Sequence, residues 1–245
     1  KDYYKDIEIE NKKKMKTAIL HLDELIDKKS EIIDIGTGNG LFVKLLYKAG
    51  YINISAHEIS GSDLSKIEKY AKQLYQDYDY SSIPSGGFDV AVMLDVLEHV
   101  PAPKFLIDSI SRILNENGII YFHTPVVTRI DIFMHYLLKL PLLKKIAVIW
   151  QRGRTSIFHL ENYTKKSIDI LLGNAGFKQA KIIFTNELSW PMKRYIEIYL
   201  FEKNPLLRKL KFLSSIIAFM FYPFLASKFF NANKAIVIAR KIQTK

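Results

Sequence analysis

The amino-acid sequence predicts an α/β protein with a doubly wound, mostly parallel sheet of seven strands and helical inserts. Two observations support this fold class. Short apolar runs alternate with segments of helical spacing between residues 30 and 125, and a glycine-rich turn joins the first run to the next helix. Strands that alternate with helices favour parallel pairing and right-handed crossovers. A chain of 245 residues is long enough to bury such a sheet.

Strands are expected where short apolar runs lie between turn-forming residues. The run at 88–94 is apolar almost throughout, as is typical of a strand covered on both faces. In chain order, strands are expected at 30–35, 52–58, 74–78, 88–94, 119–123, 181–185 and 235–239.

Helices are expected where apolar residues recur every three or four positions. The turn-forming residues Asn115–Gly118 end one of them, and Thr164 and Gly176 bound another as its caps. In chain order, helices are expected at 9–28, 41–49, 64–75, 103–114 and 164–175.

Charge is distributed unevenly along the chain. Residues 129–230 contain 17 Lys and Arg against 6 Asp and Glu, so the whole formal charge of +11 lies there and the remainder is balanced. This concentration indicates an anionic partner, such as nucleic acid, a membrane surface or a phosphate-bearing substrate, or else it serves solubility. The sequence has no Cys, which excludes a disulfide scaffold, a thiolate zinc site and a Cys nucleophile.

The segment Asp34–Gly40, DIGTGNG, lies between an expected strand and an expected helix. Glycines let a ligand approach the backbone closely, and free N–H groups at a helix start suit polar or anionic ligand atoms. Glu58 ends the next strand, 18 residues after Gly40, where an acid can accept both ribose hydroxyls. The spacing is G-x-G-x-G, which disfavours a nicotinamide cofactor. A strand–helix turn without a ligand is the simpler alternative.

From this motif onward the chain resembles the class I S-adenosylmethionine-dependent methyltransferases, closely over 30–125 and further through 159–185. Within that family it resembles the branch that contains quinone-biosynthetic and sugar O-methyltransferases. The segments that carry this likeness are Leu97–Pro101 (LEHVP), Leu114–Gly118, Thr124–Pro125, His159–Thr164 and Leu171–Phe177.

The resemblance implies a Rossmann-like methyltransferase fold and S-adenosylmethionine as the cofactor. Glu58 matches the family's ribose-binding acid, and Asp79 matches the acid near the adenine, with Asp77 as the alternative. The cofactor-binding residues implied in this way are Asp34, Gly36, Thr37, Gly38, Asn39, Gly40, Glu58, Asp79, Tyr80 and Leu94.

His99 and His159 are the candidate catalytic residues. Methyl transfer depends mainly on alignment, and a general base helps when the acceptor is a hydroxyl. His99 follows the fourth strand, at the edge where such folds bind ligands. A structural role at a helix start is the alternative for both histidines. His123 lies within a strand and is more typical of a core residue. Asp95 is a further candidate to face the methyl-transfer site, although a solvated strand-end carboxylate is the more common case.

Two motifs that would indicate other chemistry are missing from the sequence. The motif Asn/Asp-Pro-Pro-Tyr/Phe, which this family uses to methylate amino groups of nucleobases and proteins, does not follow the fourth strand. We also find no compact group of metal ligands in the sequence, so no metal is predicted.

The chain is expected to form a single domain, with 30–125 as its cofactor-binding half and with basic, apolar inserts at 126–158 and 190–231. The longest apolar run, Phe212–Ser227, is too short for a spanning helix and contains Pro223. Basic residues beside an apolar run suit an anionic membrane surface, or else the insert caps the acceptor site. Nucleic acid is a less suitable partner, because its binding sites need exposed polar and stacking groups.

We therefore predict a methyltransferase that O-methylates a small-molecule or lipid-linked acceptor, such as a quinone precursor or a glycan intermediate. The alternatives are a methyltransferase of soluble nucleotide-linked sugars and a membrane-associated, cofactor-binding module without turnover. The N-terminal segment is charged and lacks a secretory apolar region. We accordingly expect a cytoplasmic protein with peripheral attachment to the inner face of the membrane.

Overall fold

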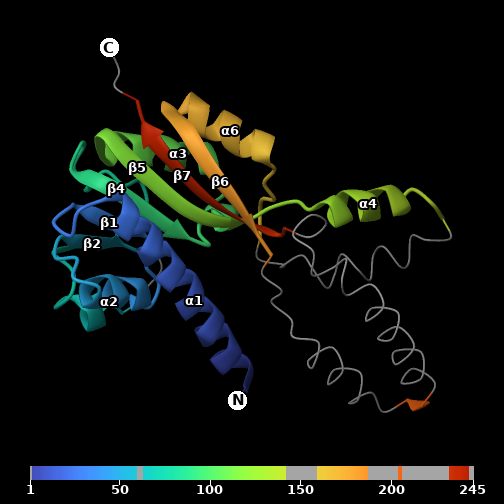
Figure 1. Ribbon diagram of the computed structural model, residues 1–245, viewed down its shortest axis with the longest axis horizontal. Coiled ribbons are helices and arrows are strands. Elements are labelled where there is room, and N and C mark those ends of the chain that lie inside the picture. The colour runs from blue at the N-terminus through green and yellow to red at the C-terminus, as the bar shows by residue number, and fades with distance from the viewer. Residues whose placement is uncertain (1, 60–62, 142–158, 187–203, 206–231, 243–245) are drawn as a thin grey trace. The chain divides into compact units, whose positions relative to one another are not determined.

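The computed structural model describes residues 2–59, 63–141, 159–186, 204–205 and 232–242 (Figure 1). Its seven-stranded sheet has the order β3-β2-β1-β4-β5-β7-β6, which confirms the predicted fold class. β1 pairs in parallel with β2 and β4, β2 with β3, and β4 with β5. The strands are β1 Ile32–Ile35, β2 Ile54–His57, β3 Gln73–Tyr75, β4 Phe88–Leu94, β5 Leu114–Pro125, β6 Phe177–Thr185 and β7 Lys234–Lys241.

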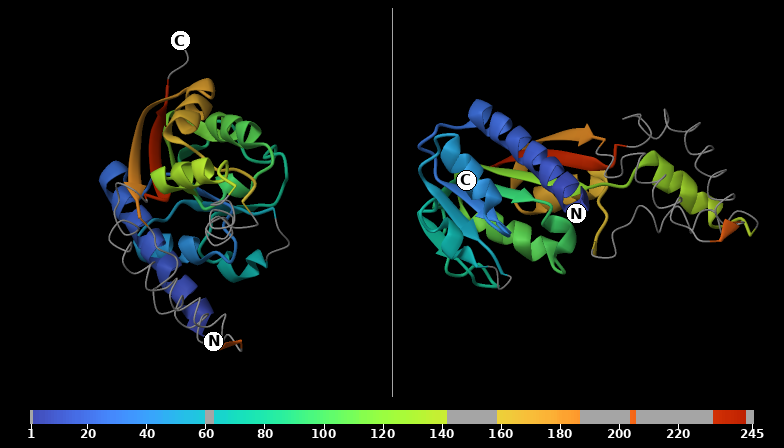
Figure 2. Two further views of the ribbon diagram at one scale, coloured as in Figure 1. Left: turned by 90° about the vertical axis from the view of Figure 1, so that its right-hand side faces the viewer. Right: turned by 90° about the horizontal axis from the view of Figure 1, so that it is seen from below.

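Helices cover both faces of the sheet (Figures 1 and 2). α1 packs beside α2 on one face, and α3 packs beside α6 on the other. On α1, Ala18 and Leu22 are fully buried, and His21 hydrogen-bonds the Tyr121 hydroxyl of β5 at 3.2 Å. The helical elements are α1 Asp2–Leu25, α2 Leu41–Lys48, η1 Leu64–Ile67, η2 Leu97–His99, α3 Pro103–Ile113, α4 Arg129–Leu137 and α6 Lys165–Asn174.

The predicted helix at 64–75 is wrong. Only one turn of 3₁₀ helix forms, η1, whose start is capped by Asp63 as it accepts from the Ser65 N–H. The Lys72 N–H then donates to the Ile54 carbonyl at 2.6 Å, and the chain continues as β3. The apolar spacing fits a helix, but hydrogen bonding to the edge of β2 takes the chain into the sheet instead.

The predicted turn at Asn115–Gly118 falls inside the span of β5. The pairing of β4 with β5 changes register there, because Phe88 pairs with Leu114 whereas Val90 pairs with Ile119. Asn117 has a left-handed φ of +64°. The turn-forming residues therefore make an irregularity within the strand.

The chain divides into two compact units. Unit 1 comprises residues 1–124, 165–182 and 236–245, and unit 2 comprises 125–164 and 183–235. In unit 2, Thr128 and Asp131 cap the start of α4 reciprocally: the Thr128 hydroxyl donates to the Asp131 carboxylate at 2.7 Å and accepts from the Asp131 N–H at 3.1 Å.

The predicted inserts fall mainly in unit 2. α4 belongs to the insert predicted at 126–158, and the apolar run Phe212–Ser227 lies outside the described residues. Across the part of the chain that the structure describes, no helix combines the length and the apolar character needed to cross a bilayer.

Candidate functional site

The glycine-rich segment forms the turn between β1 and α2. Gly36, Gly38 and Gly40 have left-handed φ angles of +72°, +56° and +71°. The N–H groups of Gly36 and Thr37 donate to the His57 carbonyl, at 2.8 and 3.1 Å. These hydrogen bonds attach the turn to the end of β2. The left-handed backbone of the turn favours glycine, which has no Cβ.

The three glycines are needed for different reasons. A Cβ on Gly36 would lie 2.6 Å from Cγ2 of Val96, and a Cβ on Gly40 would lie 2.2 Å from Cγ2 of Ile67. A Cβ on Gly38 would meet no heavy atom within 4 Å. Packing therefore closes two of the positions, while Gly38 borders space through which a ligand can approach the backbone.

Glu58 contacts the glycine turn, while its binding of ribose stays a prediction. Oε2 of Glu58 accepts a hydrogen bond from the Gly38 N–H at 2.7 Å. A carboxylate has several lone pairs, so it can hold the turn and still receive a donor from a ligand. In the next residue, Asn39, Oδ1 accepts a hydrogen bond from the Leu41 N–H at 3.1 Å, at the start of α2.

Asp34 lies beneath this turn and is only 2% exposed. Burial raises the pKa of its carboxyl group to about 7; the nearby Thr37 hydroxyl opposes this shift, and the negative charge of Glu58 adds to it. Asp34 is therefore buried behind the turn, and its predicted part in cofactor binding stays a prediction.

Asp77, Asp79 and Tyr80 follow β3. Asp77 accepts hydrogen bonds from the N–H and hydroxyl of Ser82, at 3.1 and 2.6 Å. Asp79 is exposed and accepts from the Ser81 N–H at 3.1 Å. Of the two acids that the resemblance left open for the adenine side, Asp79 is thus the more accessible to a ligand.

Two residues that sequence reasoning missed position this segment. Nε2 of His57 hydrogen-bonds the Asp77 carbonyl at 2.8 Å, and the His57 ring lies 4.6 Å from that of Tyr80, which is buried. Arg112 donates to the carbonyls of Ile83 and Tyr80, at 2.9 and 2.5 Å. A polar residue inside an apolar strand marks His57 in the sequence, whereas nothing in the sequence marks Arg112.

Leu94, Asp95 and His99 lie at the carboxyl end of β4. Leu94 is half-buried at the last strand position, and Asp95 follows with a left-handed φ of +56°. His99 ends η2 and is exposed, and its N–H donates to the Val96 carbonyl at 2.9 Å. Because β4 pairs in parallel with β1, this segment and the glycine turn leave the same edge of the sheet.

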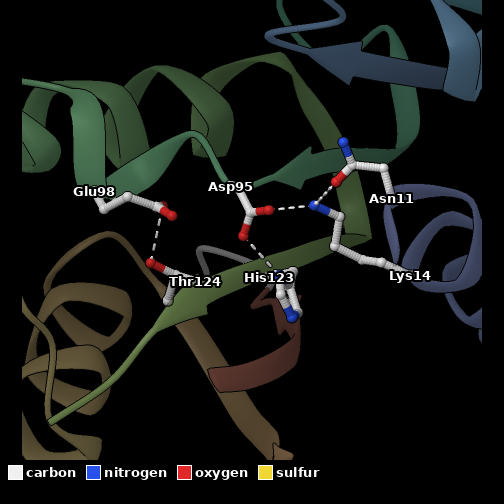
Figure 3. A network of polar contacts seen from close by, with 6 residues as sticks. All are labelled: Asn11, Lys14, Asp95, Glu98, His123 and Thr124. Atoms are coloured by element: carbon white, nitrogen blue, oxygen red, sulfur yellow. Dashed lines mark hydrogen bonds and ion pairs between the residues drawn. The ribbon is translucent and has the colours of Figure 1, made fainter. Parts of the chain in front are cut away.

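A polar network links the end of β4 to β5 and α1 (Figure 3). Nδ1 of His123 lies 2.8 Å from Oδ1 of Asp95, and Lys14 forms an ion pair with the other carboxylate oxygen. Nearby, the Thr124 hydroxyl donates to the fully buried Glu98 at 3.1 Å. Buried polar groups held in this way fix the geometry of this edge.

His159, the second predicted catalytic residue, belongs to unit 2, where it is half-buried. It precedes Tyr163, whose carbonyl accepts from the Val127 N–H at 2.8 Å. A catalytic role for His159, like that of His99, stays a prediction.

Comparisons with known proteins identify the family and the fold of this chain. A family model described as a methyltransferase domain matches residues 8–181. The chain is 30% identical over 102 residues to a ubiquinone biosynthesis O-methyltransferase of Colwellia psychrerythraea, covering 38% of this chain and 41% of that protein. It is 29% identical over 112 residues to the protein of the same name from Idiomarina loihiensis, covering 42% and 45%. The chain thus spans less than half the length of these relatives.

Solved structures share the fold at low sequence identity. A Haloferax volcanii methyltransferase, solved in complex with the Trm112 activator, has a TM-score of 0.63 at 13% identity, covering 98% of this chain and 94% of that one. A Haemonchus contortus phosphoethanolamine N-methyltransferase, solved with phosphomonomethylethanolamine and S-adenosylhomocysteine, has a TM-score of 0.58 at 14% identity, covering 93% and 52%. At such identities the likeness concerns the fold alone.

Proposed function

Because this chain belongs to the methyltransferase-domain family, whose methyl donor is S-adenosylmethionine, we propose that it is an enzyme that transfers this methyl group to a hydroxyl of a small-molecule or lipid-linked acceptor. The observation that supports this best is the glycine turn with Glu58 at the amide of Gly38.

The residues at the carboxyl ends of β1 and β2 suit this cofactor. The space beside Gly38 lets a ligand approach the backbone, and the carboxylate of Glu58 suits the ribose hydroxyls. Exposed Asp79 and the backbone around Tyr80 suit the adenine side. S-adenosylmethionine, when bound, supplies a methyl group on a positively charged sulfur that is ready for direct displacement.

In methyl transfer, the protein itself contributes the alignment of the acceptor and the removal of its proton. Holding a hydroxyl in line with the methyl carbon supplies much of the rate. A general base near the carboxyl end of β4 assists as the hydroxyl loses its proton, and the exposed His99 is our first candidate. His159 is the second candidate, and it is tested independently.

The acceptor class rests on the partial likeness to ubiquinone biosynthesis O-methyltransferases. A quinone precursor and a glycan intermediate are both compatible with it. The alternatives are a nucleotide-linked sugar and a protein that binds the cofactor without turning it over.

One experiment separates these possibilities. The protein is incubated with S-adenosylmethionine carrying a labelled methyl group and with cell extract, and the products are separated into lipid, glycan, small-molecule and RNA fractions. We expect label in the lipid or glycan fraction. Label in RNA alone contradicts the proposal, and so does cofactor binding without label in any fraction.

We further propose an anionic membrane surface as a partner. The net charge of the chain lies in residues 129–230, a segment that contains the apolar run 212–227. In the described part of unit 2, α4 exposes Ile132, Phe133 and Tyr136 on one side of the helix. Exposed apolar and basic side chains together suit the headgroup boundary of an anionic bilayer.

Flotation with anionic liposomes tests this attachment. Wild-type protein should float with them at low salt and less at high salt, because salt screens exposed charges beyond about 8–10 Å. Changing Arg208, Lys209 and Lys211 to Glu should abolish flotation and leave cofactor binding intact. The same change at three exposed lysines of unit 1, Lys48, Lys69 and Lys104, is the matched control. Wild-type protein that never floats contradicts the attachment and favours a soluble acceptor.

A further inference from the structure

Asp95 has a left-handed backbone conformation, which is uncommon for residues other than glycine. It follows β4 directly, with a φ of +56°. Residues other than glycine adopt this left-handed region at a cost, and such strain is concentrated at functional sites, where the surrounding structure maintains it. Here the strained residue carries a carboxylate.

Two groups from different elements contact the two oxygens of this carboxylate (Figure 3). Nδ1 of His123 lies 2.8 Å from Oδ1, and because an ionised carboxylate only accepts hydrogen bonds, this nitrogen carries the proton. The ammonium of Lys14, on α1, pairs with Oδ2 and also donates to Oδ1 of Asn11 at 3.2 Å. His123 is 1% exposed and the Lys14 side chain 11%, whereas the Asp95 side chain stays 27% exposed. Of these three groups, Asp95 is therefore the one that a ligand reaches most easily.

Asp95 and the glycine turn follow neighbouring strand ends. Ile35, the last residue of β1, pairs with Met93, and β4 ends one residue later at Leu94, so both segments leave the sheet beside each other. The neighbouring strand is fixed as well, because the Asp95 N–H donates to the His123 carbonyl at 3.0 Å. Ligands of open α/β sheets bind outside the carboxyl ends of the strands, where the strand order reverses, and that point here lies between β1 and β4.

We propose that Asp95 is an acceptor-binding residue, which accepts a hydrogen bond from a hydroxyl or amine of the methyl acceptor, and that Lys14 and His123 are positioning residues that fix its carboxylate. This inference rests on the proposed methyl transfer. It adds a requirement on the acceptor, which must present a hydrogen-bond donor to Asp95. The general base remains a separate residue.

The pairing with Lys14 gives α1 a part in acceptor binding. The ammonium compensates the carboxylate charge at a partly buried position, where an unpaired charge is costly. It also restricts the side-chain rotation of Asp95, which lowers the entropy lost when the acceptor binds. Removal of Lys14 should therefore weaken acceptor binding although Lys14 itself does not contact the acceptor.

The test measures methyl transfer at saturating S-adenosylmethionine against increasing amounts of the extract fraction that accepts label from wild-type protein. Asp95→Asn is the informative variant, because Asn tolerates a left-handed φ and keeps an oxygen for His123 while it loses the charge. The half-saturating amount should rise about tenfold to a hundredfold, the range expected for the loss of a charge-assisted hydrogen bond. Lys14→Met should change it in the same direction by a smaller factor.

Three controls accompany these variants. Lys104 and Asp108 form an ion pair of the same residue types on the exposed side of α3, and Asp108→Asn and Lys104→Met should leave the half-saturating amount unchanged. Calorimetry should give each variant the wild-type affinity for S-adenosylmethionine. The Asp95→Asn/Lys14→Met double variant should be no worse than Asp95→Asn alone, because Lys14 acts through Asp95.

The outcomes distinguish this inference from the proposed function. If wild-type protein binds S-adenosylmethionine but labels no fraction, the proposed function fails and this inference fails with it. If wild-type protein labels a fraction and Asp95→Asn is half-saturated by the same amount, only the inference fails. A lower maximal rate at an unchanged half-saturating amount also contradicts it, because that result places Asp95 in the chemical step.

Discussion

Two turns leave the same edge of the sheet, and they reach a left-handed backbone by different means. The turn after β1 uses Gly36, Gly38 and Gly40, for which positive φ angles cost little. The turn after β4 places Asp95 at a φ of +56°, held by side chains from α1 and β5. In the first turn, glycine by itself permits the left-handed conformation. In the second turn, tertiary contacts of the Asp95 side chain stabilise it.

This difference separates what each turn can do. A turn of glycines brings backbone N–H groups and open space to a ligand, which suits the recognition of a cofactor. A turn that holds a carboxylate and leads to His99 brings side-chain chemistry, which suits acceptor binding and proton removal.

The largest effect is expected in the turn after β4. If His99 removes the acceptor proton, His99→Ala should lower kcat by ~10²–10⁴ and leave the affinity for S-adenosylmethionine unchanged. Methyl transfer to the extract fraction measures the rate, and calorimetry measures the affinity. His159→Ala is a parallel test, and His135→Ala, at an exposed position of α4, is the control. A variant that keeps more than about a tenth of the rate assigns its histidine a structural role.

In the turn after β1, Gly40→Ala should mainly lower stability, whereas Gly38→Ala should mainly lower cofactor affinity. Both add a Cβ at a left-handed φ, but at residue 40 that Cβ would lie 2.2 Å from Ile67, which is 1% exposed. Overpacking and backbone strain together should lower the free energy of unfolding of Gly40→Ala by about 2–5 kcal/mol, measured in urea.

Gly38→Ala adds its Cβ to open space, so it should lose only the strain component of stability while its cofactor affinity falls. Adding Ile67→Ala to Gly40→Ala should restore part of the lost stability. Equal destabilisation by the two glycine variants would contradict the distinction between a packed and an open glycine.

The same contrast explains how much of the molecule the sequence predicts. The strand at 88–94 coincides with β4, and the strand order follows the predicted fold class, because apolar runs and crossover rules are local or general. The predicted helix at 64–75 is wrong because pairing of β3 with β2, a long-range interaction, overrides the apolar spacing.

The sequence likewise predicts one part of the candidate site and not the other. Glycines and a strand-end acid mark the turn and Glu58 in the sequence, and the structure joins them at Gly38. The Asp95–His123 contact spans 28 residues and the Lys14–Asp95 contact spans 81, so no local pattern predicts them. From the sequence, His123 is interpreted as a core residue, and for Asp95 a solvated strand-end carboxylate is favoured over a place at the methyl-transfer site. The network that they form becomes evident only in three dimensions.

The pH dependence of stability tests the buried support of the turn after β1. The pKa of Asp34 is raised from an ordinary value of 3.8 to about 7, so the folded protein binds this proton more tightly than the unfolded chain. The resulting stabilisation is fully present below pH 3.8 and is lost as the pH rises to about 7. Between pH 5 and 8, the free energy of unfolding should fall by about 2–3 kcal/mol more in wild-type protein than in Asp34→Asn.

Urea unfolding at the two pH values measures this difference. Asp108→Asn removes an exposed carboxyl group and should keep the wild-type pH dependence. If Asp34→Asn loses as much stability as wild-type protein over this range, Asp34 ionises without penalty and the turn does not rest on a buried neutral acid.

The smallest effect concerns Glu58, which accepts a hydrogen bond from the turn and is proposed to bind the ribose. Glu58→Ala removes the acceptor of the Gly38 N–H together with any bonds to ribose hydroxyls. A charge-assisted hydrogen bond contributes ~1.5–3 kcal/mol, so the affinity for S-adenosylmethionine should fall about tenfold to a hundredfold by calorimetry. Glu116→Ala, at an exposed position of β5, should leave the affinity unchanged.

Glu58→Gln separates the two roles of this side chain. Its amide oxygen still accepts from the Gly38 N–H, but its NH₂ group cannot accept from a ribose hydroxyl. If Glu58 serves mainly the ribose, Glu58→Gln should bind S-adenosylmethionine nearly as weakly as Glu58→Ala. If it serves mainly the turn, the Gln variant should approach wild-type affinity and the conformation of the glycine turn becomes the determinant of binding. Wild-type affinity in both variants, or binding of NAD in place of S-adenosylmethionine, would place the cofactor site away from the turn after β1.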